Sequence, residues 1–329
     1  MSKVLGSRAV KYGFVVLTLA LGAYAVSTRW TDIHHDLGLI GLRWSALALL
    51  AVLAALFTSM LSWRALLVGL GSPLPVTTSA RIFFIGQLGK YLPGAVWPIL
   101  AQMEIAAAHK VPRTRTGLAS VLTMLIALLS GLIIAVVALP FTGGGNQYAW
   151  VFLAAPVLVA CLYPKILNWG FGRLLKLARR TPLDQPLGGR AIVISLGWSF
   201  LSWLCYGLQI WVLAVRVGAP TGTGLPLAIG TFAFAWCAGF LVIFAPAGGA
   251  IREVVIVAML GPTLGGNGKA LAVALVSRAV TAAADVITAG AATIAHRRDK
   301  KKAAAIAPDA EAITGEDTSG AAPNAATAR

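Results

Sequence analysis

Long apolar runs alternate along the chain with short segments in which Lys and Arg are concentrated. A helix needs about 20 apolar residues to cross a bilayer, and six of the runs come close to that length. The predicted spans cover residues 12–28, 45–62, 117–139, 149–164, 191–215 and 270–295. The pattern therefore predicts an all-α polytopic membrane protein with six full spans.

Two further apolar stretches, residues 82–103 and 225–262, are each interrupted near the middle. The interruptions are Pro93-Gly94 in the first stretch, and Pro246 with Gly248-Gly249 in the second. Proline removes an amide donor and glycine lowers helix propensity, so both helices should break there. For the first stretch we expect a re-entrant hairpin. For the second, a re-entrant hairpin and two short helices that meet at 246–249 are equally compatible with the sequence.

The distribution of basic residues predicts the topology, because loops rich in Lys and Arg remain on the cytoplasmic side. Basic residues precede the first span, fill the loop at 165–190 and follow the last span at 297–302. The loop around 29–44 carries balanced charges and should lie outside. Both termini are therefore expected in the cytoplasm, with each broken stretch entering and leaving on one side.

This order of elements repeats, with two spans, a broken stretch and a further span in each half. Three spans per half is an odd number, so the halves should have opposite orientations, as in transporters built from inverted repeats. The expected transmembrane domain covers residues 1–302, with halves at 1–140 and 149–302. Residues 303–329 are rich in Ala and Thr without apolar periodicity, which predicts a disordered cytoplasmic tail.

Composition narrows the function classes. The chain of 329 residues is 58% hydrophobic and 12% charged, with a formal net charge of +16. Soluble domains carry about 25% charged residues, so a cytosolic enzyme is excluded, and the basic excess beside apolar runs argues against a nucleic-acid partner. Motifs typical of catalysis, metals or cofactors are absent from the sequence. We therefore expect no enzymatic activity, cofactor or metal.

A few ionisable residues inside apolar segments are the candidates for function, because such groups are costly in a membrane. They are Lys90, Arg252, Glu253, Arg278 and Asp285. Arg252 and Glu253 follow the Gly248-Gly249 break, where a new helix would offer amide donors to a phosphate. Arg278 and Asp285 are seven residues apart and share a helix face. Alternatively, the charged residues of the second half pair with one another to hold helices together, and Lys90 extends to the headgroups. The second-half residues are Arg252, Glu253, Arg278 and Asp285.

Three motifs resemble one family. The segment Gly89-Lys90-Tyr91-Leu92-Pro93-Gly94 with Trp97, the segment Pro246-Ala247-Gly248-Gly249 with Arg252-Glu253, and Ser277-Arg278 with Asp285 carry the resemblance. They are similar to signatures of the lysylphosphatidylglycerol synthase transmembrane-region family, also called flippase-like, over about residues 10–297. Many members of that family also carry an acid–arginine pair after the first-half serine, where this chain has Val121 and Leu122 behind Ser120.

The resemblance implies a bundle with two re-entrant segments in a bacterial plasma membrane, and a flippase for a phospholipid or a polyprenyl-phosphate-linked lipid. Lys90, Arg252 and Arg278 would bind the phosphate, while Glu253 and Asp285 balance the charge. The expected substrate-binding set adds the signature residues Tyr91, Pro93, Gly94, Trp97, Gly248 and Gly249. The alternatives are a scaffold whose 165–190 loop docks an envelope-synthesis enzyme, and a membrane transferase with Glu253 or Asp285 as base.

Overall fold

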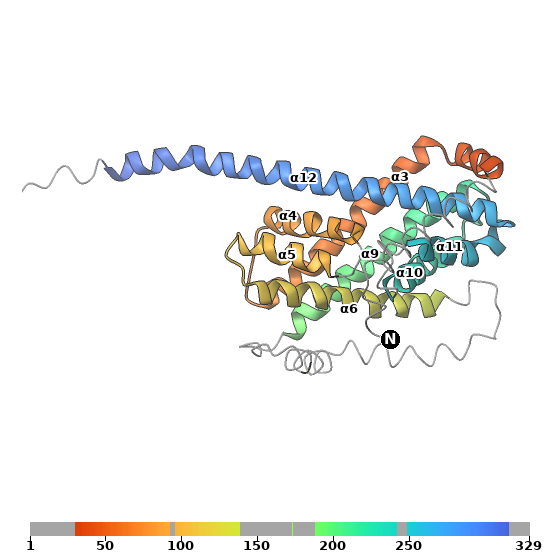
Figure 1. The fold of residues 1–329 in the computed structure, drawn as a ribbon, viewed down its shortest axis with the longest axis horizontal. Coiled ribbons are helices and arrows are strands. Elements are labelled where there is room, and N and C mark those ends of the chain that lie inside the picture. Colours follow the sequence, from red (N-terminus) through yellow and green to blue (C-terminus); the bar gives the residue numbers. More distant parts are fainter. Residues whose placement is uncertain (1–29, 93–95, 139–172, 174–187, 242–248, 316–329) are drawn as a thin grey trace, which may run out of the picture.

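The computed structural model describes residues 30–92, 96–138, 173, 188–241 and 249–315, and every regular element there is helical (Figure 1). The elements are α3 (Trp30–Gly69), α4 (Val76–Gln87), the 3₁₀ helix η1 (Leu88–Tyr91), α5 (Trp97–Ala107), α6 (Arg113–Ala138), α9 (Gly189–Arg216), α10 (Gly224–Leu241), α11 (Gly249–Leu264) and α12 (Asn267–Gly315). The predicted spans at 12–28 and 149–164 lie outside the described residues.

Five described helices are long and apolar enough to cross a membrane. They are Ile40–Gly69, Arg113–Ala138, Gly189–Arg216, Gly224–Leu241 and Asn267–Arg298. Four contain or closely match the predicted spans at 45–62, 117–139, 191–215 and 270–295. The fifth is the first part of the second broken stretch. The predicted all-α polytopic membrane fold is therefore confirmed.

The first broken stretch forms two short helices that pack against each other, α4 with 12 residues and α5 with 11. At 1.5 Å per residue they are about 18 and 16 Å long, well short of the hydrocarbon core of about 30 Å. Pro75 precedes α4, and Pro98 lies in the first turn of α5, where a missing amide hydrogen costs little. These lengths fit the predicted re-entrant hairpin.

The second broken stretch forms longer helices, α10 with 18 residues and α11 with 16, and they also pack on each other. Residues 242–248, which connect them, lie outside the described part of the chain. Of the two arrangements left open by the sequence, two short helices are the one that the lengths favour.

Two predictions about the ends of the fold were wrong. The loop expected at 29–44 is helical from Trp30, with a break at Gly41, whose φ of 62° suits a residue without a side chain. The tail expected to be disordered from 303 begins as helix, because α12 continues to Gly315. The segment after Lys302 is rich in alanine, which has the highest helix propensity, and the helix continues through Pro308. Residues 316–329 are outside the described residues.

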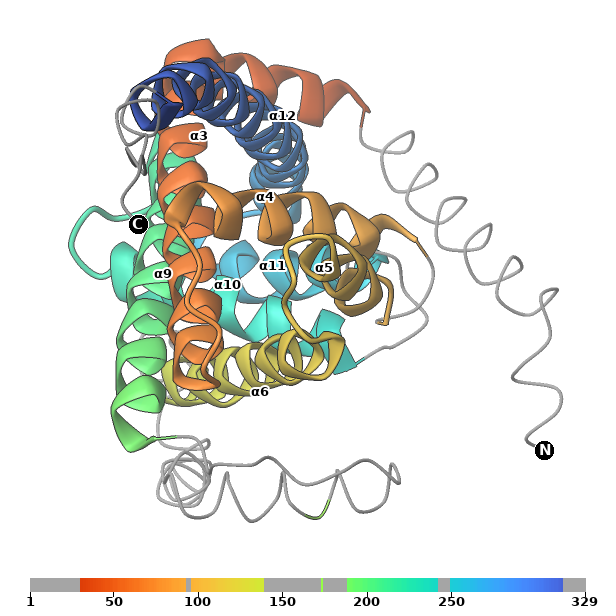
Figure 2. The same ribbon diagram turned by 90° about the vertical axis from the view of Figure 1, so that its left-hand side faces the viewer.

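The contacts between helices have the symmetry of a repeat in which α3, α4, α5 and α6 correspond to α9, α10, α11 and α12. The helices α4 and α5 pack on each other as α10 and α11 do, α4 packs on α12 as α10 packs on α6, and α3 packs on α12 as α9 packs on α6. In Figures 1 and 2, α6 and α12 lie on opposite sides of the bundle. The central contact, α3 against α9, joins equivalent helices.

Hydrogen bonds show that α3 and α9 run antiparallel. The Ser62 hydroxyl donates to the Ser195 carbonyl at 2.9 Å, and the Ser202 hydroxyl donates to the Ala55 carbonyl at 3.0 Å. Along this contact the residue numbers of α3 therefore rise while those of α9 fall. Antiparallel equivalent helices are what halves of opposite orientation produce, so the predicted inverted repeat is present in the packing.

Glycines allow the helices to approach closely, as is usual where membrane helices pack without a hydrophobic driving force. A side chain at Gly207 of α9 would collide with Ile229 of α10, and one at Gly230 of α10 with Ala138 of α6. On α6, a Cβ at Gly131 would come within 2.8 Å of the Trp203 ring of α9. These glycines hold α6, α9 and α10 together around the site described below.

We predict that Gly207→Leu destabilises the bundle by about 1–3 kcal/mol, because the added side chain must separate α9 from α10. Thermal unfolding of the purified protein in detergent measures the loss. Gly197→Leu is the matched control, since Gly197 lies on the same helix and a Cβ added there would meet no atom within 4 Å. Equal melting temperatures for the two variants would contradict the close α9–α10 contact.

Candidate functional site

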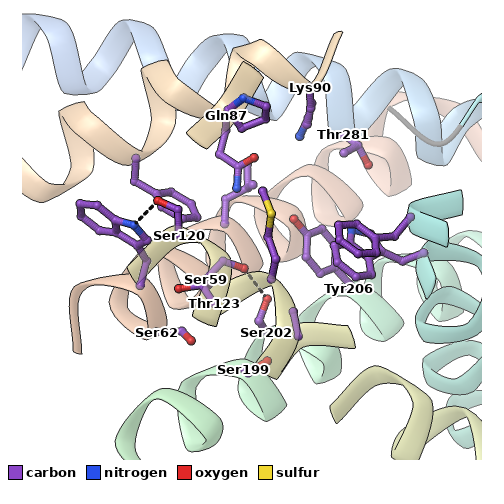
Figure 3. A pocket seen from close by; sticks show the side chains of 18 of the residues that line it. Ser59, Ser62, Gln87, Lys90, Ser120, Thr123, Ser199, Ser202, Tyr206 and Thr281 are labelled. Carbon is purple, nitrogen blue, oxygen red and sulfur yellow. Dashed lines mark hydrogen bonds between the residues drawn. The ribbon is translucent and has the colours of Figure 1, made fainter. Parts of the chain in front are cut away.

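A cavity of about 200 Å³ lies between the two halves of the bundle, and every described helix contributes to its wall. Figure 3 shows Gln87 of α4 and Lys90 of η1 on one side of it, and Ser59, Thr123 and Ser202 opposite. The wall is therefore assembled from both repeats, at the place where transporters of this architecture bind their substrates.

Lys90 and Asp285 form an ion pair across the halves. The ammonium Nζ lies 2.8 Å from Oδ1 and 2.7 Å from Oδ2 of Asp285, and the Tyr91 hydroxyl donates to Oδ2 at 2.6 Å. The Asp285 side chain is only 2% exposed, and these partners supply the hydrogen bonds that a buried carboxyl group needs. They tie the 3₁₀ helix between α4 and α5 to α12.

Glu253 and Arg278 form the second ion pair, between α11 and α12. Arg278 Nη1 donates to Glu253 Oε1 at 2.8 Å, while Glu253 Oε2 is buried without a hydrogen-bond partner in the described part of the chain. The Glu253–Arg278 pair is one of the pairings that the sequence left open, whereas Asp285 is bound by Lys90 of the other half instead of by Arg278 of its own helix.

Arg252 is held by an aromatic ring. Its guanidinium carbon lies 4.9 Å from the centre of the Phe232 ring, and Tyr206 stacks on the same phenylalanine with 4.6 Å between ring centres. A guanidinium over an aromatic face is stabilised by the ring quadrupole. Among the described residues, no carboxylate forms an ion pair with Arg252 within 4.0 Å, so its donors remain available to the cavity.

The charge on the cavity wall has one sign. Lys90 and Arg252 line it, whereas neither Asp285 nor Glu253 does, nor any other acidic side chain of the described residues. Asp285 binds Lys90 without lining the cavity, and Glu253 binds Arg278, which does not line it either. The arrangement presents positive charge to whatever enters, and it is suited to an anion.

The opposite wall is made of hydroxyl groups and indoles. The hydroxyl oxygens of Ser59 and Ser202 are hydrogen-bonded at 2.7 Å across the α3–α9 contact. Trp63 Nε1 donates to Ser120 at 3.1 Å, and Trp203 Nε1 donates to Ser130 at 3.0 Å. Each tryptophan, buried in the bundle, thus has its only side-chain donor satisfied.

These wall residues were missed by our reading of the sequence, although a signal for them exists. Ser59-Met60-Leu61-Ser62-Trp63 and Ser199-Phe200-Leu201-Ser202-Trp203 are the same S-x-L-S-W motif, and both serines and the tryptophan of each copy line the cavity. The motif places equivalent side chains from the two halves on one wall.

The predicted site residues divide into three groups. Lys90 and Arg252 line the cavity, and Tyr91, Glu253, Arg278 and Asp285 support them or pair beside them. Trp97 and Gly249 begin α5 and α11 and are not on the wall; the Trp97 side chain is 44% exposed. Pro93, Gly94 and Gly248 lie outside the described residues.

The halves differ in their charge. In the second half, α11 and α12 are joined by the Glu253–Arg278 ion pair, and at the corresponding contact of the first half the Ser120 hydroxyl donates to the Gln102 side chain. Ser120 is followed by the apolar residues Val121 and Leu122. At this pair of contacts the second half is thus ionic and the first neutral, and the ion pair that does join α5 to α6, Arg113–Glu104, is exposed.

Comparison with known families identifies the fold. The family model of the lysylphosphatidylglycerol synthase TM region matches residues 9–289. The chain belongs to this family. A comparison with curated proteins found no significant match. The matched residues include the whole described bundle except the last turns of the α12 span. Membership in this family indicates a membrane protein related to lipid handling.

We predict that Lys90 and Asp285 are energetically coupled. Asp285→Asn leaves a partly buried ammonium without its counter-charge, and Lys90→Gln leaves a buried carboxylate, so each single change should cost more than the double change. A double-mutant cycle on thermal unfolding should give a coupling of about 1–3 kcal/mol. The exposed pair Arg113–Glu104, with side chains 59% and 66% exposed, is the control and should show little coupling. Additive effects at Lys90 and Asp285 would contradict the ion pair.

Proposed function

We propose that this protein moves an anionic lipid between the leaflets of a bacterial plasma membrane, as a flippase. The observation that carries the proposal is the cavity between the two halves, whose described charged lining residues are Lys90 and Arg252. A phosphate is the anion common to the candidate substrates, a phospholipid and a polyprenyl-phosphate-linked lipid. Arg252 would bind it through two parallel N–H donors, and Lys90 would add a compact positive charge.

The repeat supports a transport mechanism. Inverted repeats with a polar site near the membrane midplane move substrates by rocking one half against the other. Here the S-x-L-S-W motifs give each half an equivalent part of the wall, so the same side chains face the headgroup whichever half moves. The lipid chains would remain in the bilayer while the headgroup occupies the cavity. No chemical reaction is part of this proposal.

Orientation and partners are part of the same proposal. Both termini would lie in the cytoplasm, because basic segments flank the first and last predicted spans and the positive-inside rule keeps such segments on that side. A scaffold that docks an envelope-synthesis enzyme stays the alternative prediction. Its docking loop at 165–190 is described only at Arg173 and at 188–190.

We predict that Arg252→Gln slows lipid translocation about ten- to hundredfold, since it removes charged hydrogen bonds to the phosphate. The measurement is the exposure of a fluorescent phosphatidylglycerol in proteoliposomes, followed with a quencher that does not cross the membrane. Arg113→Gln, a change at an exposed arginine of α6, should leave the rate unchanged. An unchanged rate in a folded Arg252→Gln protein would contradict the proposed site.

A further inference from the structure

The chemistry of the cavity wall discriminates between headgroups, and this inference rests on the proposed function. Both oxygens of Asp285 are occupied by Lys90 and Tyr91, and Glu253 is bound by Arg278. The free oxygen of Glu253 is buried and does not line the cavity. A cationic headgroup would meet Lys90 and Arg252, with no carboxylate on the described wall to receive it.

The remainder of the wall is rich in uncharged hydrogen-bonding groups. Gln87 and Tyr206 extend their amide and hydroxyl toward the cavity, as Figure 3 shows. Thr123 and Thr281 donate their hydroxyl hydrogens to backbone carbonyls of their own helices, which leaves their oxygens free to accept. Donors and acceptors are therefore mixed, and a ligand that carries several hydroxyl groups uses both.

Aromatic rings complete this surface. Trp236 stacks on Phe240 with 5.1 Å between ring centres, and Trp203 meets Trp236 edge to face at 5.4 Å. A sugar or cyclic polyol has C–H groups on the faces of its ring and O–H groups around its edge. Its faces can therefore pack on the aromatic rings while its hydroxyls bind the polar groups beside them. The volume of about 200 Å³ is room for a headgroup, and a whole lipid would exceed it.

We infer that the cavity selects the phosphate ester of an uncharged sugar or polyol, and that it excludes aminoacylated, cationic headgroups. Arg252 and Lys90 bind the phosphate. Gln87, Tyr206 and the hydroxyls of the α3–α9 wall bind the polyol. The headgroup is thus recognised by two adjacent parts of one cavity, a cationic part and a hydroxyl-rich part.

The test compares three lipids with the same acyl chains in proteoliposomes: phosphatidylinositol, which carries a polyol ring, phosphatidic acid, which carries the phosphate alone, and lysylphosphatidylglycerol, which is cationic. We expect phosphatidylinositol to be translocated at least about tenfold faster than lysylphosphatidylglycerol. Equal rates, or faster movement of the cationic lipid, would overturn the inference.

Variants separate the two parts of the cavity. Tyr206→Phe keeps the ring stacked on Phe232 but removes the hydroxyl, and Gln87→Leu removes the amide. Each should slow phosphatidylinositol about three- to tenfold and leave phosphatidic acid unchanged. Arg252→Gln should slow the translocation of both lipids by the same factor. Arg113→Gln should change the translocation of neither lipid. Variants at Tyr206 and Gln87 that leave the preference for phosphatidylinositol intact would overturn the assignment of the polyol part.

A binding measurement makes the outcome independent of transport. Each lipid is added to the detergent-purified protein and the shift in melting temperature is recorded, because a ligand that binds the folded state stabilises it. A larger shift with phosphatidylinositol than with lysylphosphatidylglycerol supports the inference even if no lipid is translocated, in which case only the flippase proposal fails. Equal shifts, or a larger one with the cationic lipid, overturn it.

Discussion

A charged side chain inside a bilayer must find its partner in the protein, because hydrocarbon supplies none. Asp285 shows what this requirement does to the fold. Its carboxylate is almost fully buried on α12, and the groups that satisfy it, Lys90 and Tyr91, come from a 3₁₀ helix far earlier in the chain. The first hairpin is therefore fixed against the last helix by an interaction that neither half makes alone.

The same requirement orders the rest of the cavity. Once Asp285 and Glu253 are neutralised by Lys90 and Arg278, Arg252 is stabilised by the Phe232 ring instead of by a carboxylate of the described residues. Hydroxyls and indoles on the opposite wall satisfy one another across α3, α6 and α9. Glycines at the α9–α10 and α6–α10 contacts keep these walls close enough for such bonds. Packing and polarity thus define the site together.

The sequence predicts the helices well and their partners poorly. Apolar length and the Pro/Gly breaks locate the spans and both broken stretches, since these depend on local chemistry. The ion pairs depend on tertiary packing, so the sequence left several pairings of Arg278 open. The structure forms the one with Glu253, and Asp285 binds Lys90, a partner that the sequence did not suggest. The serine wall was overlooked because a serine among apolar residues is common in a membrane helix, and only its repetition beside Trp63 and Trp203 marks it.

The contrast between the two halves has an energetic consequence. Their S-x-L-S-W walls are equivalent, but the ion pairs of Asp285 and Glu253 both involve α12. The neutral Gln102–Ser120 contact stands at the matching place in the first half, where the ion pair between α5 and α6, Arg113–Glu104, is exposed. Two conformations related by exchanging the halves would therefore differ in free energy, since one of them must separate charges that the other leaves together. Under the proposed transport mechanism, such a symmetric fold with an asymmetric charge distribution would have a preferred resting side, even in a membrane whose two leaflets are identical.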